Sequence, residues 1–443
     1  NYGKQADMKP DEMHRLAALN LRAGEKAKAA NAYQLALAYF RRGLDFTRET
    51  FWRDHRYGTV YELSVESVHT EYLNGNYENA EKLAMNTLPR TAGVIHKARI
   101  CNLYIVQLTM LQRYGEALDL AKEILADFGV ILPAENLGEA VREEIDKINE
   151  TVGGRDIRSF IDLGEMRIPE KIMLVELLHN LVPLTFQAAV EWFPLVVSKI
   201  VRLSLEHGNT PLSSIGYATY GFFYGPMTND YAAAHHFAAL GMELSDRYND
   251  KSCQCITREL NIAQIVWKQH VKSAEPLSIE GFRFGIESGE FQWASYLHLW
   301  HSYNLVFQGM NLEELNIRIS EYLPFAEKIK DQLSIDAFTA IQLWIDQLTH
   351  GGAAENHSGG PPMTEDEFIA ALDDHKGVMN NCLFHILKSQ TLWHLERFEE
   401  ALRHSEKAGE LIASIGGSCS LATWNFFNSL ILLALYDKSP TGK

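Results

Sequence analysis

The stretch 73–85 (Leu-Asn-Gly-Asn-Tyr-Glu-Asn-Ala-Glu-Lys-Leu-Ala-Met) decides how the rest of the chain is interpreted. Its Asn-Gly-Asn at 74–76 tolerates the left-handed backbone that ends a helix, so we expect one helix to stop there. Tyr77, Ala80 and Ala84 follow at i, i+3 and i+7, which places them on one face of a second helix. Small side chains beside a bulky one let an antiparallel neighbour approach closely. The stretch therefore predicts the turn of a helical hairpin.

The same pattern of an aromatic residue followed by alanines recurs along the chain. Its other copies are Tyr33–Ala36, Tyr114–Ala121, Tyr231–Ala238 and Phe398–Ala401. The step from Tyr77 to Tyr114 is close to the tetratricopeptide period of about 34 residues, whereas other steps are longer. The repeats are therefore degenerate. We predict an all-α fold, a tetratricopeptide-like solenoid in which helical hairpins wind into a right-handed superhelix.

Composition supports a packed protein with an acidic surface. Of the 443 residues, 46% are hydrophobic and 22% charged, which is ample for a core, and the formal net charge is −16. Such a charge disfavours nucleic acid or an anionic membrane as a partner. The odd number of cysteines in apolar patterns suits free thiols in a reducing cytoplasm. They are Cys101, Cys253, Cys255, Cys382 and Cys419.

The sequence leads us to expect neither a signal peptide nor a membrane span. The start is polar and charged, so no signal peptide is expected. The most apolar run, 421–436, is interrupted by Asn425 and Asn428, and we expect it to fall short of a membrane span of about 20 apolar residues. The chain begins at Asn1 rather than Met, which suggests a piece of a longer protein.

Breaks in the helical pattern divide the sequence into five parts. Gly129 and Pro133 end a first run of hairpins, and a Gly- and Pro-rich stretch precedes the last one. We predict N-terminal hairpins at 1–133, an irregular joint at 134–168, a central helical block at 169–350, a flexible loop at 351–363, and C-terminal hairpins with a closing helix at 364–443.

Several stretches resemble a known family. The markers are Gly154–Ile157, Asp162–Met166, Phe193–Leu195 leading into Leu203–Asn209, Tyr217–Gly221 and Trp424–Leu430. They are similar to the helical-repeat region of large multidomain signalling proteins. There a serine/threonine-kinase-like domain and an AAA/STAND-type ATPase precede the repeats, and a GAF domain with a histidine kinase follows them. The resemblance implies a module tethered to an ATPase, and it carries no activity to this chain.

Signatures of catalysis are missing from the sequence. It has neither the Gly-x-x-x-x-Gly-Lys-Ser/Thr phosphate cradle nor a His-Glu-x-x-His zinc helix. His298 and His301 lie at i, i+3, but no further ligand stands nearby at a suitable spacing. We therefore predict no catalytic residue, no cofactor and no metal site.

One aromatic stripe offers a candidate binding surface. Trp293, Tyr296, Trp300, Tyr303 and Phe307 follow a strict helical seam. Such a seam either fills the core between helices or lines the concave inner surface, where Trp and Tyr stack on a small molecule or grip a peptide. The candidate ligand or partner surface consists of Tyr220, Tyr224, Trp293, Tyr296, His298, Trp300, His301, Tyr303 and Asn304.

The leading hypothesis is a non-catalytic sensor and protein-interaction module of a larger signalling ATPase or kinase. Its partners would be a protein or peptide, a small-molecule effector, or neighbouring domains of the parent protein. A stand-alone peptide receptor is the first alternative. The second is an α/α-toroid glycosidase, which needs two carboxylates facing each other across a cleft; Glu287, Glu290 and Asp336 are available for it.

Overall fold

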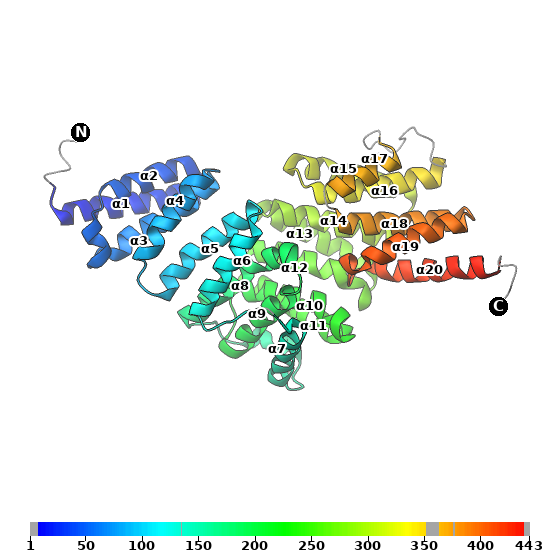
Figure 1. Cartoon of the computed structure of the whole chain (residues 1–443), viewed down its shortest axis with the longest axis horizontal. Coiled ribbons are helices and arrows are strands. Elements are labelled where there is room, and N and C mark those ends of the chain that lie inside the picture. Colours follow the sequence, from blue (N-terminus) through cyan, green and yellow to red (C-terminus); the bar gives the residue numbers. More distant parts are fainter. Residues whose placement is uncertain (1–7, 134, 351–362, 375–376, 438–443) are drawn as a thin grey trace. The chain divides into compact units, whose positions relative to one another are not determined.

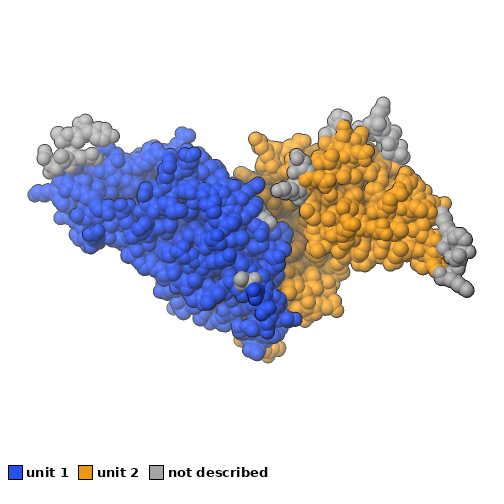
Figure 2. All heavy atoms as spheres, in the orientation of Figure 1, with its two compact units in different colours: residues 1–151, 164–210 blue, residues 152–163, 211–443 orange. Residues whose placement is uncertain are grey.

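The computed structural model describes residues 8–133, 135–350, 363–374 and 377–437. Within these ranges the regular secondary structure is helical, as predicted, and the sole β feature is an isolated bridge between Glu165 and Asn209 (Figure 1). The chain divides into two compact units (Figure 2). Unit 1 comprises residues 1–151 and 164–210, and unit 2 comprises residues 152–163 and 211–443.

Unit 1 holds nine α-helices and two short 3₁₀ helices within the described ranges. They are α1 (Pro10–Ala29), α2 (Tyr33–Asp45), η2 (Glu49–Arg53), α3 (Tyr57–Leu73), α4 (Tyr77–Thr87), η3 (Leu88–Arg90), α5 (Val94–Met110), α6 (Tyr114–Asp127), α7 (Leu137–Val152, of which the last residue falls to unit 2), α8 (Pro169–Ala188) and α9 (Phe193–His207).

The described part of unit 2 contains the remaining helices. They are η4 (Ile157–Asp162), α10 (Pro211–Thr228), α11 (Tyr231–Tyr248), α12 (Lys251–Gln264), η5 (Ile265–Trp267), η6 (Val271–Ser273), α13 (Ala274–Ser288), α14 (Phe291–Phe307), α15 (Leu312–Ile329), α16 (Gln332–His350), α17 (Glu365–Asp374), α18 (Val378–His394), α19 (Phe398–Leu411), η7 (Ile412–Ile415) and α20 (Cys419–Asp437).

The predicted hairpin turn at 74–76 is confirmed. Helix α3 ends before Asn74, Gly75 has φ +76°, and α4 begins at Tyr77. Ala80 and Ala84 are buried, because the small face of α4 lies against its neighbours. The corresponding helices of the other predicted hairpins, α1 with α2 and α5 with α6, also pack together in unit 1.

The five-part division drawn from composition remains a prediction. Residues 351–362 of the predicted flexible loop lie outside the described residues. The predicted irregular joint contains the helix α7 and, after it, the 3₁₀ helix η4. Its start is capped by Asp156, whose carboxylate accepts from the Arg158 amide at 3.0 Å.

Gly164–Met166 and Asn209, which belong to two of the resembling stretches, meet in unit 1. The Asn209 amide donates to the Gly164 carbonyl at 2.9 Å, and the Met166 amide donates to the Asn209 carbonyl at 2.9 Å. Gly208 precedes this bridge with φ +100°, and a Cβ there would come within 2.4 Å of the Gly164 oxygen. Position 208 therefore requires glycine, because a side chain there would keep the two backbone segments from pairing.

Helix α20 departs from the expectation for its apolar run. The 18-residue window 419–436 has a mean hydropathy of 1.3, so by length and composition it is apolar enough to cross a membrane, and 17% of it is buried. Asn425 and Asn428 lower the hydropathy too little, since the window contains no charged residue. One such helix is weak evidence for a membrane span.

Close packing of α10 on α11 relies on glycine. A Cβ on Gly221 would lie 2.5 Å from the Ala234 oxygen, and one on Gly241 would lie 2.4 Å from the Ser214 oxygen. Helix α10 also continues through Pro226 to Thr228. A proline costs one backbone hydrogen bond there. The preceding Gly225 lies close to Tyr231, and an added Cβ would come within 2.8 Å of its ring.

We predict that Gly241→Ala destabilises unit 2, because the added methyl would overlap the α10 backbone. A cost of about 2 kcal/mol corresponds to a Tm lower by about 4–8 °C for a unit of this size. Gly115→Ala on α6 is the matched control, since its Cβ would meet nothing within 4 Å. Thermal unfolding followed by circular dichroism checks both. Equal melting of the two variants would contradict the packing described.

Candidate ligand and partner surface

The aromatic stripe of α14 lies between core and surface. Trp293, Tyr296 and Trp300 are half-buried, and the Trp293 and Tyr296 rings meet edge to face with centroids 5.7 Å apart. Trp293 packs on the apolar cluster of Ile215 and Leu260, which links α14 to α10 and α12. These three rings keep partial access to solvent and remain candidates for stacking on a ligand.

Five of the predicted surface residues are core residues instead. Tyr220, Tyr224, His301, Tyr303 and Asn304 are buried, so the structure corrects their assignment to a surface. Tyr220 packs edge to face on Phe237 at 4.8 Å. The reason in α14 is that both flanks of the helix are covered, one by α12 and the other by α16.

Asn304 shows how this burial is compensated. Its side-chain amide donates to the backbone carbonyl of Ile262 on α12 at 3.0 Å. His301 is likewise tied to α15, with its Nδ1 3.1 Å from the Tyr322 hydroxyl. Both side chains therefore serve helix packing in this structure.

His298 lies between two aromatic rings. Its imidazole stacks on Phe282 of α13 at 4.2 Å and on Tyr322 of α15 at 3.9 Å, nearly parallel to both. Burial lowers the pKa of His298 to about 3 and that of His301 to about 4, so both imidazoles are neutral at pH 7. Among the described residues no cluster of three metal-ligating side chains includes them.

The sequence interpretation missed Glu259 on α12. Residues 253–264 of this helix are all buried, so Glu259 lies inside the unit without a cation beside it. Burial raises the pKa of Glu259 to about 8, and a hydrogen bond from Trp300 opposes part of this rise. The carboxyl is therefore mostly protonated at pH 7. The apolar residues of α12 alternate with polar ones, and this pattern gave no signal of complete burial.

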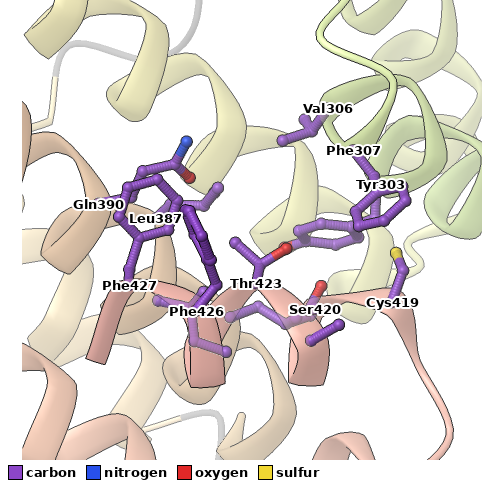
Figure 3. A pocket seen from close by; sticks show the side chains of 13 residues that line it. Tyr303, Val306, Phe307, Leu387, Gln390, Cys419, Ser420, Thr423, Phe426 and Phe427 are labelled. Atoms are coloured by element: carbon purple, nitrogen blue, oxygen red, sulfur yellow. The ribbon is translucent and has the colours of Figure 1, made fainter. Parts of the chain in front are cut away.

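A cavity of about 280 Å³ lies between α14, α18 and α20 (Figure 3). Figure 3 shows Phe307 on one wall and Phe426 and Phe427 on another, with Gln390 and Thr423 as polar groups. None of its lining side chains is charged. They are Tyr303, Val306, Phe307, Leu383, Ile386, Leu387, Gln390, Cys419, Ser420, Ala422, Thr423, Phe426 and Phe427.

This cavity suits uncharged groups rather than covalent chemistry. Cys419 lines it, but burial raises the pKa of its thiol to about 11, which keeps it protonated and a poor nucleophile. The carboxylates considered for a glycosidase do not line this cavity. Each of them has a partner of its own: Glu287 forms an ion pair with Lys251, Glu290 accepts a hydrogen bond from Ser252, and Asp336 accepts one from Gln332 at 2.7 Å.

We predict that Glu259→Gln removes a pH dependence of stability. The pKa of this carboxyl is near 4.5 in the unfolded chain and about 8 in the folded protein. Its contribution to the free energy of unfolding is therefore fully present below pH 4.5 and is lost as the pH rises from there through about 8. At pH 7 the loss is on the order of 3 kcal/mol. The Tm of Glu259→Gln should therefore match the wild type near pH 4.5 and exceed it increasingly up to pH 8.

The control for this prediction is Glu327→Gln, at an exposed position of α15. It should leave the Tm difference from the wild type constant across the same pH range. A constant difference for Glu259→Gln as well would show that the Glu259 carboxyl is ionised in the folded protein.

Comparison with known proteins gives one informative similarity. No family model matches the chain. It is similar to hybrid signal transduction histidine kinase G of Dictyostelium discoideum, with 20% identity over 378 residues. The match covers 79% of this chain and 11% of that protein. The chain thus resembles a small part of a much longer signalling protein.

Proposed function

We propose that the chain is a tetratricopeptide-like solenoid that acts as a non-catalytic sensor and interaction module within a larger signalling ATPase or kinase. The observation that carries this proposal is the similarity of most of the chain to one-tenth of a hybrid histidine kinase. The proposal places the module in the cytoplasm, beside the other domains of its parent protein.

The packing of the helices supports the solenoid. In unit 2, α10 contacts α12, α12 contacts α14, α14 contacts α16, α16 contacts α18, and α18 contacts α20. Most helices from α10 to α20 also pack on the helix that follows them in the sequence. A stack in which each layer touches mainly its neighbours deforms as a whole when one layer shifts. Binding at one layer would therefore bias a domain attached to the end of the stack.

The chemistry of the described side chains supports a non-catalytic role. All five cysteines are buried, and burial raises the pKa of each thiol. The pKa is raised to about 11 for Cys382 and to about 12 for Cys101 and Cys253. The half-buried rings Trp293, Tyr296 and Trp300 offer stacking and hydrogen bonding without a nucleophile. This is a surface for binding a small effector or a peptide side chain.

We predict that a thermal-shift screen of this chain against metabolites and short peptides yields a stabilising ligand. A ligand present at a hundred times its dissociation constant adds about 2.7 kcal/mol to the native state. Trp300→Phe replaces the indole with a smaller aromatic ring that offers less area for stacking, so it should reduce the shift. Tyr39→Phe, on α2 of unit 1, is the matched control and should leave the shift unchanged.

Two results would contradict the proposal. A complete absence of shifts would contradict the sensor role. Release or incorporation of the γ-phosphate of ATP by this chain alone would contradict the non-catalytic role.

A further inference from the structure

The cavity between α14, α18 and α20 is larger than close packing of helices leaves behind. Its volume is about 280 Å³, whereas voids in protein interiors rarely exceed the size of a water molecule. Phe426 lines the cavity and is 60% exposed, so a small molecule can reach it from solvent. A preformed hollow with mostly apolar walls is the usual form of a small-molecule site.

Two phenylalanines of α20 form an aromatic corner on one wall of this cavity (Figure 3). The ring centroids of Phe426 and Phe427 are 5.3 Å apart, and their planes meet at 85°. Phe427 is held from the other side by Trp393 of α18, with ring centroids 5.6 Å apart. A flat aromatic molecule can therefore stack on one ring and present its edge to the other. Because the corner is already formed, binding orders few further side chains.

Two polar side chains on the cavity wall have unused hydrogen-bonding capacity. Helical threonines often return their hydroxyl to the carbonyl four residues earlier, as Thr391 does to Leu387 at 3.1 Å. Thr423 of α20 makes no such bond. Neither its hydroxyl nor the side-chain amide of Gln390 on α18 is hydrogen-bonded to another described residue (Figure 3). Each of these groups can both donate and accept a hydrogen bond from a ligand.

Charge and size narrow the class of ligand. None of the lining side chains is charged at pH 7, since burial raises the pKa of both Tyr303 and Cys419. An ionised ligand would lose its hydration there without gaining a counter-charge. An apolar cavity of about 150 Å³ holds one benzene molecule. The larger volume of this cavity, about 280 Å³, therefore suits two fused rings.

We propose that this cavity is a binding site for a neutral bicyclic aromatic molecule that carries one hydrogen-bonding group. The rings of the ligand pack into the corner of Phe426 and Phe427, and its polar group bonds to Thr423 or Gln390. These residues are distinct from the half-buried rings of α14, and the ligand is of a more specific class. The inference therefore goes beyond the proposed function and does not depend on it.

Fluorescence titration of the whole chain with three probes tests the class of ligand. The probes are β-naphthol, which has the proposed chemistry, β-naphthoate, which has the same rings and a negative charge, and naphthalene, which has no polar group. We expect saturable binding of one β-naphthol per chain, with a dissociation constant on the order of 100 µM or lower. β-Naphthoate should bind at least about tenfold more weakly, because its charge finds no partner.

Removing the Thr423 hydroxyl tests the polar contact. Thr423→Val keeps the shape of the side chain, so it should weaken β-naphthol binding by about two- to tenfold and leave naphthalene binding unchanged. A merely structural effect would weaken both probes alike. Thr109→Val on α5 of unit 1 is the matched control, since Thr109 also lies on a helix but does not line the cavity. It should leave both affinities unchanged.

Filling the cavity tests the location. Ala422 lines the cavity, and Ala422→Trp places an indole where the ligand would lie, so this variant should lose binding of β-naphthol and naphthalene. Ser429→Trp adds the same side chain at an exposed position of α20 outside the cavity lining, and it should bind both probes like the wild type. Circular dichroism verifies that both variants fold.

Three results would overturn the proposal. The first is a wild type that shows no saturable binding of β-naphthol. The second is equal affinity for β-naphthol and β-naphthoate, which would show that the site does not select neutral molecules. The third is a folded Ala422→Trp variant that still binds β-naphthol, which would place the probe elsewhere on the protein. The effect of Trp300→Phe on other ligands is measured separately, so failure here leaves the proposed function standing.

Discussion

The close approach of paired helices is the constraint on which the rest of the structure depends. Ala80 and Ala84 in unit 1, and Ala234 and Ala238 in unit 2, are buried where a neighbouring helix crosses. At α10 and α11 even alanine is too large, and Gly221 takes its place. Because backbones meet at these points, the large aromatic residues beside them are fixed in position.

Two buried carboxylates illustrate how the protein treats charge inside such packing. Burial alone would raise the pKa of Glu144, but Lys199 at 2.7 Å and Arg202 at 2.6 Å bring it below its ordinary value. Glu144 thus stays ionised and ties α7 to α9. Glu259 has no cation beside it and is held protonated instead. The first carboxyl stabilises helix packing as an ion, and the second is a neutral hydrogen-bonding group next to Trp300.

Local signals in the sequence predicted the helices well. The Asn-Gly-Asn turn and the aromatic–alanine pattern determine backbone and packing within a few residues, so the hairpins of unit 1 followed directly from them. The heptad spacing of α14 was recognised, but spacing does not reveal that both flanks of a helix are covered. Tyr303 and Asn304 were therefore assigned to a surface although they are core residues. Glu259 and the cavity at Phe426 depend on helices distant in sequence, which no local pattern encodes.

The short segment 152–163 limits how the chain can be divided into its two units. It follows α7 of unit 1 but belongs to unit 2, where η4 packs on α11 and Arg247 donates to the Ile161 carbonyl at 2.6 Å. The chain thus passes between the units three times. A gene fragment ending at residue 210 would carry this segment away from α11. No single cut in the chain therefore separates the two units with each of them intact.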